Sequence, residues 1–333
     1  MITDIAPGGI CLFARNIKDP QQTRHLLDKF RDSLQVVPFL SVDQEGGRVD
    51  RFRRIMPASP AAAKFTSVDD VVEFAQITAN ALHLLGFNMD FAPVVDVIDE
   101  VRESAGNGLF SRSFGRNNVD VASFAGAFLK TLRENGIIGC LKHFPGLGAS
   151  GVDSHDELPR IMISEAEIRN TDLFPYAEFI PDRAEMVMVA HAAYPNVRLQ
   201  ETDRDGRLLP STLSFNFVSK LLRSEFGFEG VTITDDLEMG AIVRNYGIGD
   251  ACKMAVMAGN DMLAICASEN AIREGFEAVS NAIASGDIPE SRIDDSIERI
   301  SRLKSKLASP VDFDTECLTE ISDRLLKLNA RLN

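Results

Sequence analysis

The sequence predicts an α/β fold, specifically a TIM-type (β/α)8 barrel formed by a single domain over residues 1–333. Short apolar, β-branched runs alternate with longer segments of helical periodicity, which is typical of a parallel sheet built from βαβ units. Polar residues repeatedly follow the apolar runs, as they do where a barrel builds its site at the C-terminal ends of its strands. The sequence has neither a G-x-G-x-x-G turn nor a P-loop, so a doubly wound open sheet fits less well.

Seven apolar runs are predicted to be strands: 9–13, 39–43, 89–92, 137–141, 186–190, 230–234 and 262–265. Five segments between them have helical periodicity and are predicted to be helices: 23–34, 71–85, 119–135, 213–226 and 249–258. We expect the strand that begins near Gly9 to occupy the second strand position of the barrel. An incomplete or irregular first β/α unit would then leave a strand edge open, and self-association could cover it, so an oligomer is an open alternative.

Polar side chains that could form a site follow four of the predicted strands. They are the 43–51 segment with Asp43 and Arg51, the pair Lys142 and His143, His191, and the pair Asp235 and Asp236. Strand C-termini meet at one face of a barrel, so we expect these groups to converge there. For His191 the sequence favours a supporting role in the wall of the site.

The segment 142–155 combines lysine, histidine and carboxylate side chains on a chain shaped by Gly and Pro. Asp153 and His155 are two residues apart, so in an extended segment both side chains leave on the same side. The carboxylate could then orient and polarise the imidazole for proton transfer. The alternative is a simple turn, in which Asp153 accepts from the backbone of His155. For the tripeptide alone the turn is the favoured interpretation, and only the rest of the chain changes that preference.

Composition excludes several classes of function. The formal net charge of -14 opposes binding to nucleic acid or to an anionic membrane, and no basic stripe offsets it. No apolar run is long enough to span a bilayer. The five cysteines are scattered and have no metal-ligand spacing, so we expect reduced cysteines, a cytoplasmic protein, and neither a metal nor a cofactor.

A series of motifs runs through nearly the whole chain in one order. They are GGICLFARN (8–16), VDQEGGRV (42–49), DFAPVVDV (90–97), RSFG (112–115), KHFPGLGASGVDSH (142–155), AHAAYP (190–195), STLS (211–214), GFEGV (227–231) and TDDLEM (234–239). In this order and spacing the chain resembles glycoside hydrolase family 3, and within it the single-domain bacterial β-N-acetylglucosaminidases of cell-wall recycling.

The resemblance implies a role for individual residues. Asp235 is similar to the family's catalytic nucleophile, with Asp236 ranked second, and His155 paired with Asp153 is similar to its general acid/base. The implied sugar-binding set is Asp43, Arg51, Arg112, Lys142 and His143. These roles suit retaining hydrolysis, which needs an attacking carboxylate and a proton donor near the leaving oxygen. Histidine can be that donor because its ordinary pKa lies close to neutral pH.

The resemblance further implies a retaining exo-β-N-acetylglucosaminidase that acts on small GlcNAc-containing muropeptide fragments through a covalent glycosyl-aspartate. The absence of Trp argues against a long polysaccharide groove and favours a short pocket. Two alternatives stay open. One is a β-N-acetylglucosaminide or β-glucoside phosphorylase, since a neutral imidazole does not repel incoming phosphate. The other is a non-catalytic sugar-binding homologue.

Overall fold

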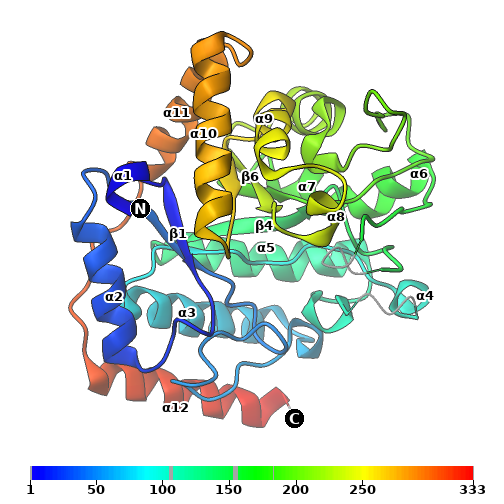
Figure 1. Ribbon diagram of the computed structural model, residues 1–333. Helices are drawn as coiled ribbons and strands as arrows, with labels where there is room; N and C mark the ends of the chain where they lie inside the picture. The colour runs from blue at the N-terminus through cyan, green and yellow to red at the C-terminus, as the bar shows by residue number, and fades with distance from the viewer. Residues whose placement is uncertain (1, 105–107, 153–156, 183, 333) are drawn as a thin grey trace. The chain divides into compact units, whose positions relative to one another are not determined.

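The computed structural model describes residues 2–104, 108–152, 157–182 and 184–332 (Figure 1). The chain forms two compact units. Unit 1 comprises Met1–Val95, Ser111–Leu141 and Lys304–Asn333, and unit 2 comprises Asp96–Phe110 and Lys142–Leu303. No helix in the described ranges is both long enough and apolar enough to cross a membrane.

Unit 1 contains parallel strands in chain order. They are β1 (Gly9–Leu12), β2 (Phe39–Val42), β3 (Met89–Asp90) and the first part of β4 (Ile138–Phe144). The register pairs Gly9 with Phe39, and Met89 with both Ser41 and Ile138. All four residues of β2 are buried, which explains why this strand is continuously apolar apart from Ser41.

Three of the helices of unit 1 begin at a capping side chain. The helical segments of this unit are α1 (Ile2–Ile5), α2 (Pro20–Asp32), the short η1 (Ala62–Lys64), α3 (Val68–Leu85), α5 (Asn118–Glu134) and α12 (Thr315–Leu332). Asp19, Ser67 and Asn117 accept from backbone N–H groups in the first turns of α2, α3 and α5. Helix α3 lies between α5 and α12 (Figure 1). Phe74 of α3 and Phe128 of α5 meet at 5.8 Å between ring centroids.

Unit 2 continues the same pattern. It contains the end of β4, then β5 (Met186–Val189), β6 (Val231–Asp236) and β7 (Met262–Ala264), all parallel. The Ala190 N–H donates to the Phe144 carbonyl at 2.8 Å, which joins the end of β4 to the end of β5. The helical segments are α4 (Glu100–Glu103), α6 (Glu165–Glu167), η3 (Ile168–Asp172), α7 (Phe174–Phe179), η4 (Ser211–Leu213), η5 (Asn216–Glu225), α8 (Gly240–Val243), α9 (Ile248–Ala258), α10 (Glu269–Ser285) and α11 (Glu290–Lys304).

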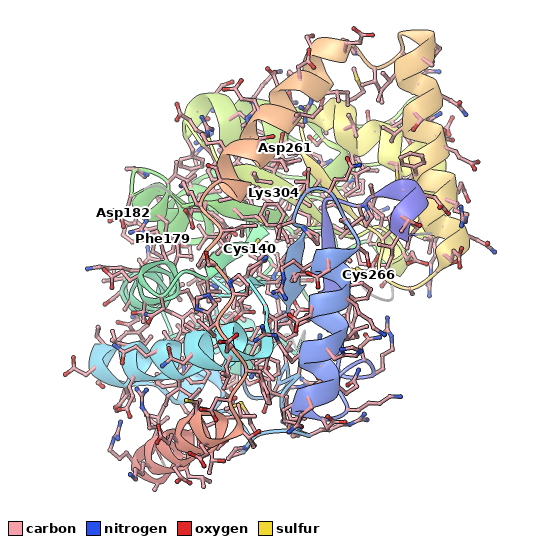
Figure 2. The ribbon with its side chains drawn as sticks, turned by 90° about the vertical axis from the view of Figure 1, so that its left-hand side faces the viewer. Cys140, Phe179, Asp182, Asp261, Cys266 and Lys304 are labelled. Atoms are coloured by element: carbon pink, nitrogen blue, oxygen red, sulfur yellow. The ribbon has the colours of Figure 1, made fainter. Side chains whose placement is uncertain are left out.

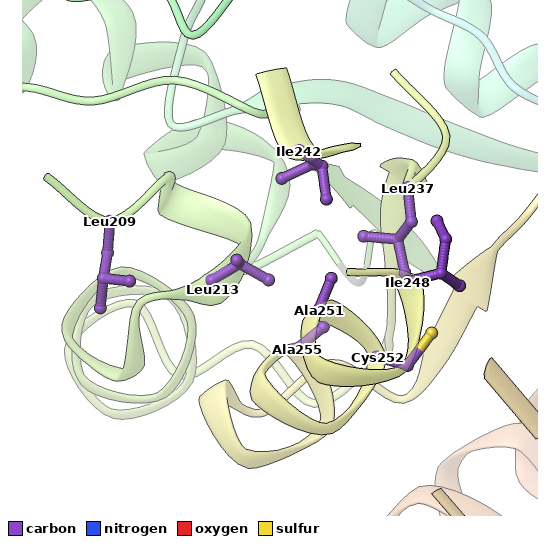
Figure 3. Close-up of a cluster of buried hydrophobic side chains, with 8 residues drawn as sticks. All are labelled: Leu209, Leu213, Leu237, Ile242, Ile248, Ala251, Cys252 and Ala255. Atoms are coloured by element: carbon purple, nitrogen blue, oxygen red, sulfur yellow. The ribbon is translucent and has the colours of Figure 1, made fainter. Parts of the chain in front are cut away.

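A buried apolar cluster anchors the segments that follow β5 and β6 in unit 2. It consists of Leu209, Leu213, Leu237, Ile242, Ile248, Ala251, Cys252 and Ala255 (Figure 3). The cluster joins η4, the residue after β6, α8 and α9, so the chain on either side of β6 is held by close packing.

At the start of β7, a charged network replaces apolar packing. Asp261, labelled in Figure 2, contacts Arg223 at 2.5 Å, Arg299 at 3.1 Å and Arg292 at 3.5 Å. Its carboxylate is fully buried, so three guanidinium groups compensate the charge. This network lies before β7 and therefore at the N-terminal ends of the strands, where barrels carry stabilising groups.

The predicted fold class is confirmed: parallel strands in chain order alternate with helices, and the described residues supply seven strands. This number fits the incomplete or irregular barrel. Two strands extend further at their C-terminal ends than predicted. Strand β4 continues through Phe144 because all seven of its residues are buried, so Lys142 and His143 belong to the strand. Strand β6 likewise includes Asp235 and Asp236. Helices α10, α11 and α12 were not among the predicted segments.

Candidate active site

Asp235 occupies the C-terminal end of β6 in unit 2, and its side chain is only partly buried. Burial by itself would raise the pKa of Asp235, but the electrostatic interactions with His143 first, and then with His191, outweigh burial and hold the pKa below the ordinary 3.8. The N–H of Asp236 also donates to its Oδ1 at 2.8 Å. Asp235 is therefore an ionised carboxylate that remains accessible, which is what a nucleophile requires.

The neighbouring Asp236 has a different environment. Its Oδ1 accepts from the N–H groups of Glu238 at 3.0 Å and Cys266 at 3.2 Å. Burial raises its pKa, and the nearby negative charge of Glu238 adds to that rise. Asp236 thus connects the turn after β6 to the end of β7, and the geometry favours Asp235 over Asp236 as the attacking group.

His191, just after β5, is completely buried and bonded at both ring nitrogens. Its Nε2 lies 3.0 Å from the carbonyl oxygen of Asp236, and its Nδ1 lies 2.9 Å from Oγ1 of Thr212. Because a carbonyl only accepts, Nε2 carries a proton. The Thr212 hydroxyl donates to the Ala190 carbonyl at 2.6 Å, so the hydroxyl oxygen is the atom that faces Nδ1. Burial lowers the pKa of His191. His191 therefore fixes the C-terminal end of β6 through its hydrogen bond to the Asp236 carbonyl.

Lys142 and His143 lie near the C-terminal end of β4, where both side chains are buried. Nδ1 of His143 lies 2.7 Å from Oδ2 of Asp96, whose carboxylate is also buried. The other oxygen of Asp96 accepts from the Leu147 N–H at 2.6 Å. One carboxylate thus orients the imidazole of His143 and fixes the chain that follows β4.

Unit 1 contributes the turn after β2, which carries Asp43 and Arg51. Arg51 contacts Oδ2 of Asp43 at 3.4 Å. The side-chain oxygen of Gln44 accepts from the Arg51 N–H at 2.8 Å and so closes the turn. Gly46 is required there, since its φ is +88° and a Cβ would lie 2.2 Å from the Pro60 carbonyl oxygen.

Arg112, also in unit 1, ends the short helix η2 (Phe110–Arg112). It forms a two-pronged ion pair with Glu45, through contacts of 2.7 and 2.8 Å. Because Glu45 is nearly fully buried, Arg112 compensates its charge while remaining partly exposed itself. Arg112 is therefore held in one orientation.

The structure brings Asp235, Lys142, His143 and His191 into mutual electrostatic reach within unit 2, and Asp43 and Arg51 together within unit 1. The predicted proton-transfer pair, Asp153 and His155, lies outside the described residues. In the part of the chain that is described, no group of three or more His, Cys, Asp or Glu side chains is arranged to hold a metal ion.

The model of the glycosyl hydrolase family 3 N-terminal domain matches residues 1–303 of the chain. The chain belongs to glycoside hydrolase family 3.

Relatives in this family include β-hexosaminidases. One from Pseudoalteromonas piscicida is 33% identical over 322 residues, which are 90% of this chain and 53% of that protein. One from Pseudomonas aeruginosa is 36% identical over 267 residues, covering 78% of this chain and 75% of that protein. A family 3 β-N-acetylglucosaminidase from Paenibacillus sp. FPU-7 has a TM-score of 0.86 at 32% identity, covering 98% of this chain and 64% of that structure. The chain therefore spans about half the length of the first relative.

Within this family 3 chain, sequence reasoning missed Asp96 as the partner of His143 and Glu45 as the partner of Arg112. Both residues lie inside motifs that carry the resemblance, DFAPVVDV and VDQEGGRV. In both motifs the carboxylate lies directly beside apolar residues that the fold buries. A buried carboxylate needs a partner, so this pattern could have indicated that Asp96 and Glu45 each pair with a cation. The identity of the partner could not be predicted, because Asp96 and His143 are 47 residues apart and Glu45 and Arg112 are 67 residues apart.

Proposed function

We propose that this chain hydrolyses terminal β-linked N-acetylglucosamine with retention of configuration, through a covalent ester on Asp235. The observation that carries the proposal is the accessible, ionised Asp235 carboxylate at the end of β6, beside His143 and His191. The family membership and the β-hexosaminidase relatives support the same activity. We extend the proposal to residues 1–333 as one catalytic domain, and the alignment of the Paenibacillus structure with 98% of the chain supports this.

In the first step, an Asp235 oxygen forms a bond to the anomeric carbon while the glycosidic C–O bond breaks. The leaving oxygen takes a proton from His155, which Asp153 keeps charged and oriented. In the second step, His155 removes a proton from water, the water oxygen bonds to the anomeric carbon, and the ester bond to Asp235 breaks. The roles of His155 and Asp153 rest on the sequence.

The family resemblance assigns sugar binding to Lys142, His143, Asp43, Arg51 and Arg112. Lys142 and the arginines donate to sugar oxygens, and Asp43 accepts from hydroxyl groups. Among the described residues, Nε of Arg51 is buried without a hydrogen-bond partner. A buried donor of this kind is costly unless it is satisfied, and a sugar oxygen would satisfy it.

The proposed natural substrates are GlcNAc-containing peptidoglycan fragments in the cytoplasm. None of the five cysteines forms a disulfide, which supports a reducing compartment. The -14 charge and the absence of Trp suit a small soluble fragment better than an anionic or extended polymer.

Replacing Asp235 by Ala tests the proposal. We expect Asp235→Ala to lower kcat for a chromogenic β-N-acetylglucosaminide by about 10³-fold or more, because the attacking group is lost. Asp236→Asn is the matched control, since its amide oxygen can still accept from Glu238 and Cys266. A slow fluorosugar substrate should label the wild-type enzyme, and mass spectrometry should locate the label on Asp235. Labelling of Asp236, or wild-type turnover without any adduct, would overturn the assignment.

A further inference from the structure

Unit 2 contains a cavity of about 570 Å³ beside the segments that follow β4, β5 and β6. Its lining includes Val152 and Arg160 after β4, Arg207 after β5, and Gly240, Arg244 and Tyr246 after β6. The volume lies within the range of pockets that bind small molecules. The C-terminal ends of three successive strands thus supply one cavity, on the side where a barrel carries its site.

The cavity is rich in positive charge although the protein as a whole is strongly acidic. Its lining contains Arg160, Arg207 and Arg244 but one carboxylate, Glu157. Arg207 is paired with Asp203 at 2.7 Å and with Asp205 at 2.9 Å. Arg160 and Arg244 are exposed, and neither has an ion-pair partner among the residues that the structure describes. Two guanidinium groups are therefore available to a ligand, and guanidinium groups bind carboxylates through paired hydrogen bonds.

The backbone on both sides of this cavity is fixed. Next to Arg160, the Ile161 N–H donates to the Ala193 carbonyl at 2.8 Å, which ties this segment to the end of β5. Arg244 caps helix α8, whose Ile242 belongs to the buried cluster of Figure 3. Tyr246 packs against the same cluster. A site on a fixed backbone loses less conformational entropy when a ligand binds.

The cavity is also joined to the nucleophile through a short turn. Strand β6 ends at Asp236, the Met239 N–H donates to the Asp236 carbonyl at 3.0 Å, and α8 begins at Gly240. The strand that carries Asp235 thus leads directly into the cavity wall. Resting on the proposed function, we propose that this cavity receives the leaving-group side of the substrate and that Arg160 and Arg244 select a leaving group that bears a carboxylate.

Two features of peptidoglycan fragments carry such a carboxylate, the lactyl ether of a muramic acid and the attached peptide. The test therefore compares kcat/KM for three substrates: the neutral disaccharide GlcNAc–GlcNAc, GlcNAc–MurNAc, and GlcNAc–MurNAc with a dipeptide. We expect the wild-type enzyme to prefer a carboxylated substrate over the neutral one. We expect Arg160→Gln and Arg244→Gln each to lower the ratio of carboxylated to neutral kcat/KM about tenfold, since a hydrogen bond to a charged group is lost.

Arg244→Lys should restore part of the ratio, because it keeps the charge but not the two-pronged geometry. Arg204→Gln is the matched control. Arg204 is an exposed arginine between Thr202 and Leu208, which pair with each other, and unlike the nearby Arg207 it does not line the cavity. A preference seen with GlcNAc–MurNAc identifies the lactyl group, and one that needs the dipeptide identifies the peptide; either supports the inference.

Cleavage of all three substrates without preference would overturn the inference and leave the proposed function standing. Equal loss of kcat/KM for neutral and carboxylated substrates in a variant that carries both Arg160→Gln and Arg244→Gln would also overturn it. A folded wild-type enzyme that cleaves no β-N-acetylglucosaminide would overturn the proposed function, and the inference with it.

Discussion

His143 owes its orientation to Asp96, through the 2.7 Å contact between Nδ1 and Oδ2. A carboxylate acceptor keeps a proton on Nδ1 and leaves Nε2 to face elsewhere. Asp96 also holds the Leu147 N–H, so it couples the imidazole to the chain after β4. It acts through His143 and is therefore a positioning residue.

Asp96→Asn should lower kcat/KM by about 10–100-fold while the protein stays folded, a loss typical of removing an orienting partner. The amide oxygen can still accept from Leu147, but the amide N–H₂ would donate toward His143 and reverse its tautomer. Steady-state kinetics with circular dichroism would measure this. Asp96→Ala is the comparison, because it also releases Leu147 and should lower stability. Unchanged kinetics in Asp96→Asn would remove the positioning role.

The pH dependence of kcat/KM should carry the signature of Asp235. Its pKa is held below 3.8 by His143 and His191 against the effect of burial, so the carboxylate stays ionised as the pH falls until that lowered value is passed. The acid limb that this group sets should therefore lie below pH 3.8. His143→Gln removes a positive charge and should move the limb upward. Measurements from pH 3 to 6, each on protein shown to be folded, would detect the shift; an unmoved limb would contradict the electrostatic account.

At the scale of elements, one ion pair fastens α4 to η3 within unit 2. Arg102 contacts Asp172 through two bonds of 2.8 and 3.0 Å, and Asp172 is fully buried. Asp172 packs against Gly146, because a Cβ atom at position 146 would lie only 2.6 Å from the Cβ of Asp172. Tyr194 donates to the Gly146 carbonyl at 2.8 Å. The chain that follows Lys142 and His143 is thus supported from two sides.

Arg102→Gln should lower the free energy of unfolding by about 3–5 kcal/mol, because it leaves the buried Asp172 carboxylate without its cation. Denaturant titration would measure the loss, and Arg102→Lys should recover part of it. Glu167→Gln is the control. Glu167 also bonds Arg102, but its side chain is 45% exposed, so its removal should cost about 0–1 kcal/mol. Equal effects of the two changes would show that burial does not decide the energy here.

Sequence periodicity identified the order of the strands and the five longest helical segments before α10. The strands could be identified because a strand that is buried throughout has a continuous apolar sequence. Periodicity failed at the ends of β4 and β6. There β4 includes Lys142 and His143, and β6 includes Asp235 and Asp236. These residues are polar, and polar residues after an apolar run are typical of a loop. The strand conformation survives because these polar groups find partners that are distant in sequence, such as Asp96.

At the scale of the whole molecule, the residue types of the site could be predicted but their pairings could not. The motifs identified Asp235, Lys142 and His143, and the structure places all three within electrostatic reach of one another. The ion pairs of Glu45 with Arg112 and of Asp96 with His143 join segments far apart in the chain, so they depend on the completed fold. Local periodicity contains no information on such contacts.

Net charge bears on the choice between hydrolysis and phosphorolysis. A protein with a formal charge of -14 repels phosphate over long range, which favours water as the group that attacks the proposed glycosyl-Asp235 ester. We expect 10–50 mM phosphate, a range we choose for the assay, to leave the rate unchanged and to yield no sugar 1-phosphate, with sulfate at equal ionic strength as the control.

Proton NMR during turnover should show the β-anomer of GlcNAc before mutarotation. Initial release of the α-anomer would exclude retention, and a sugar 1-phosphate would identify the chain as a phosphorylase that uses the same nucleophile.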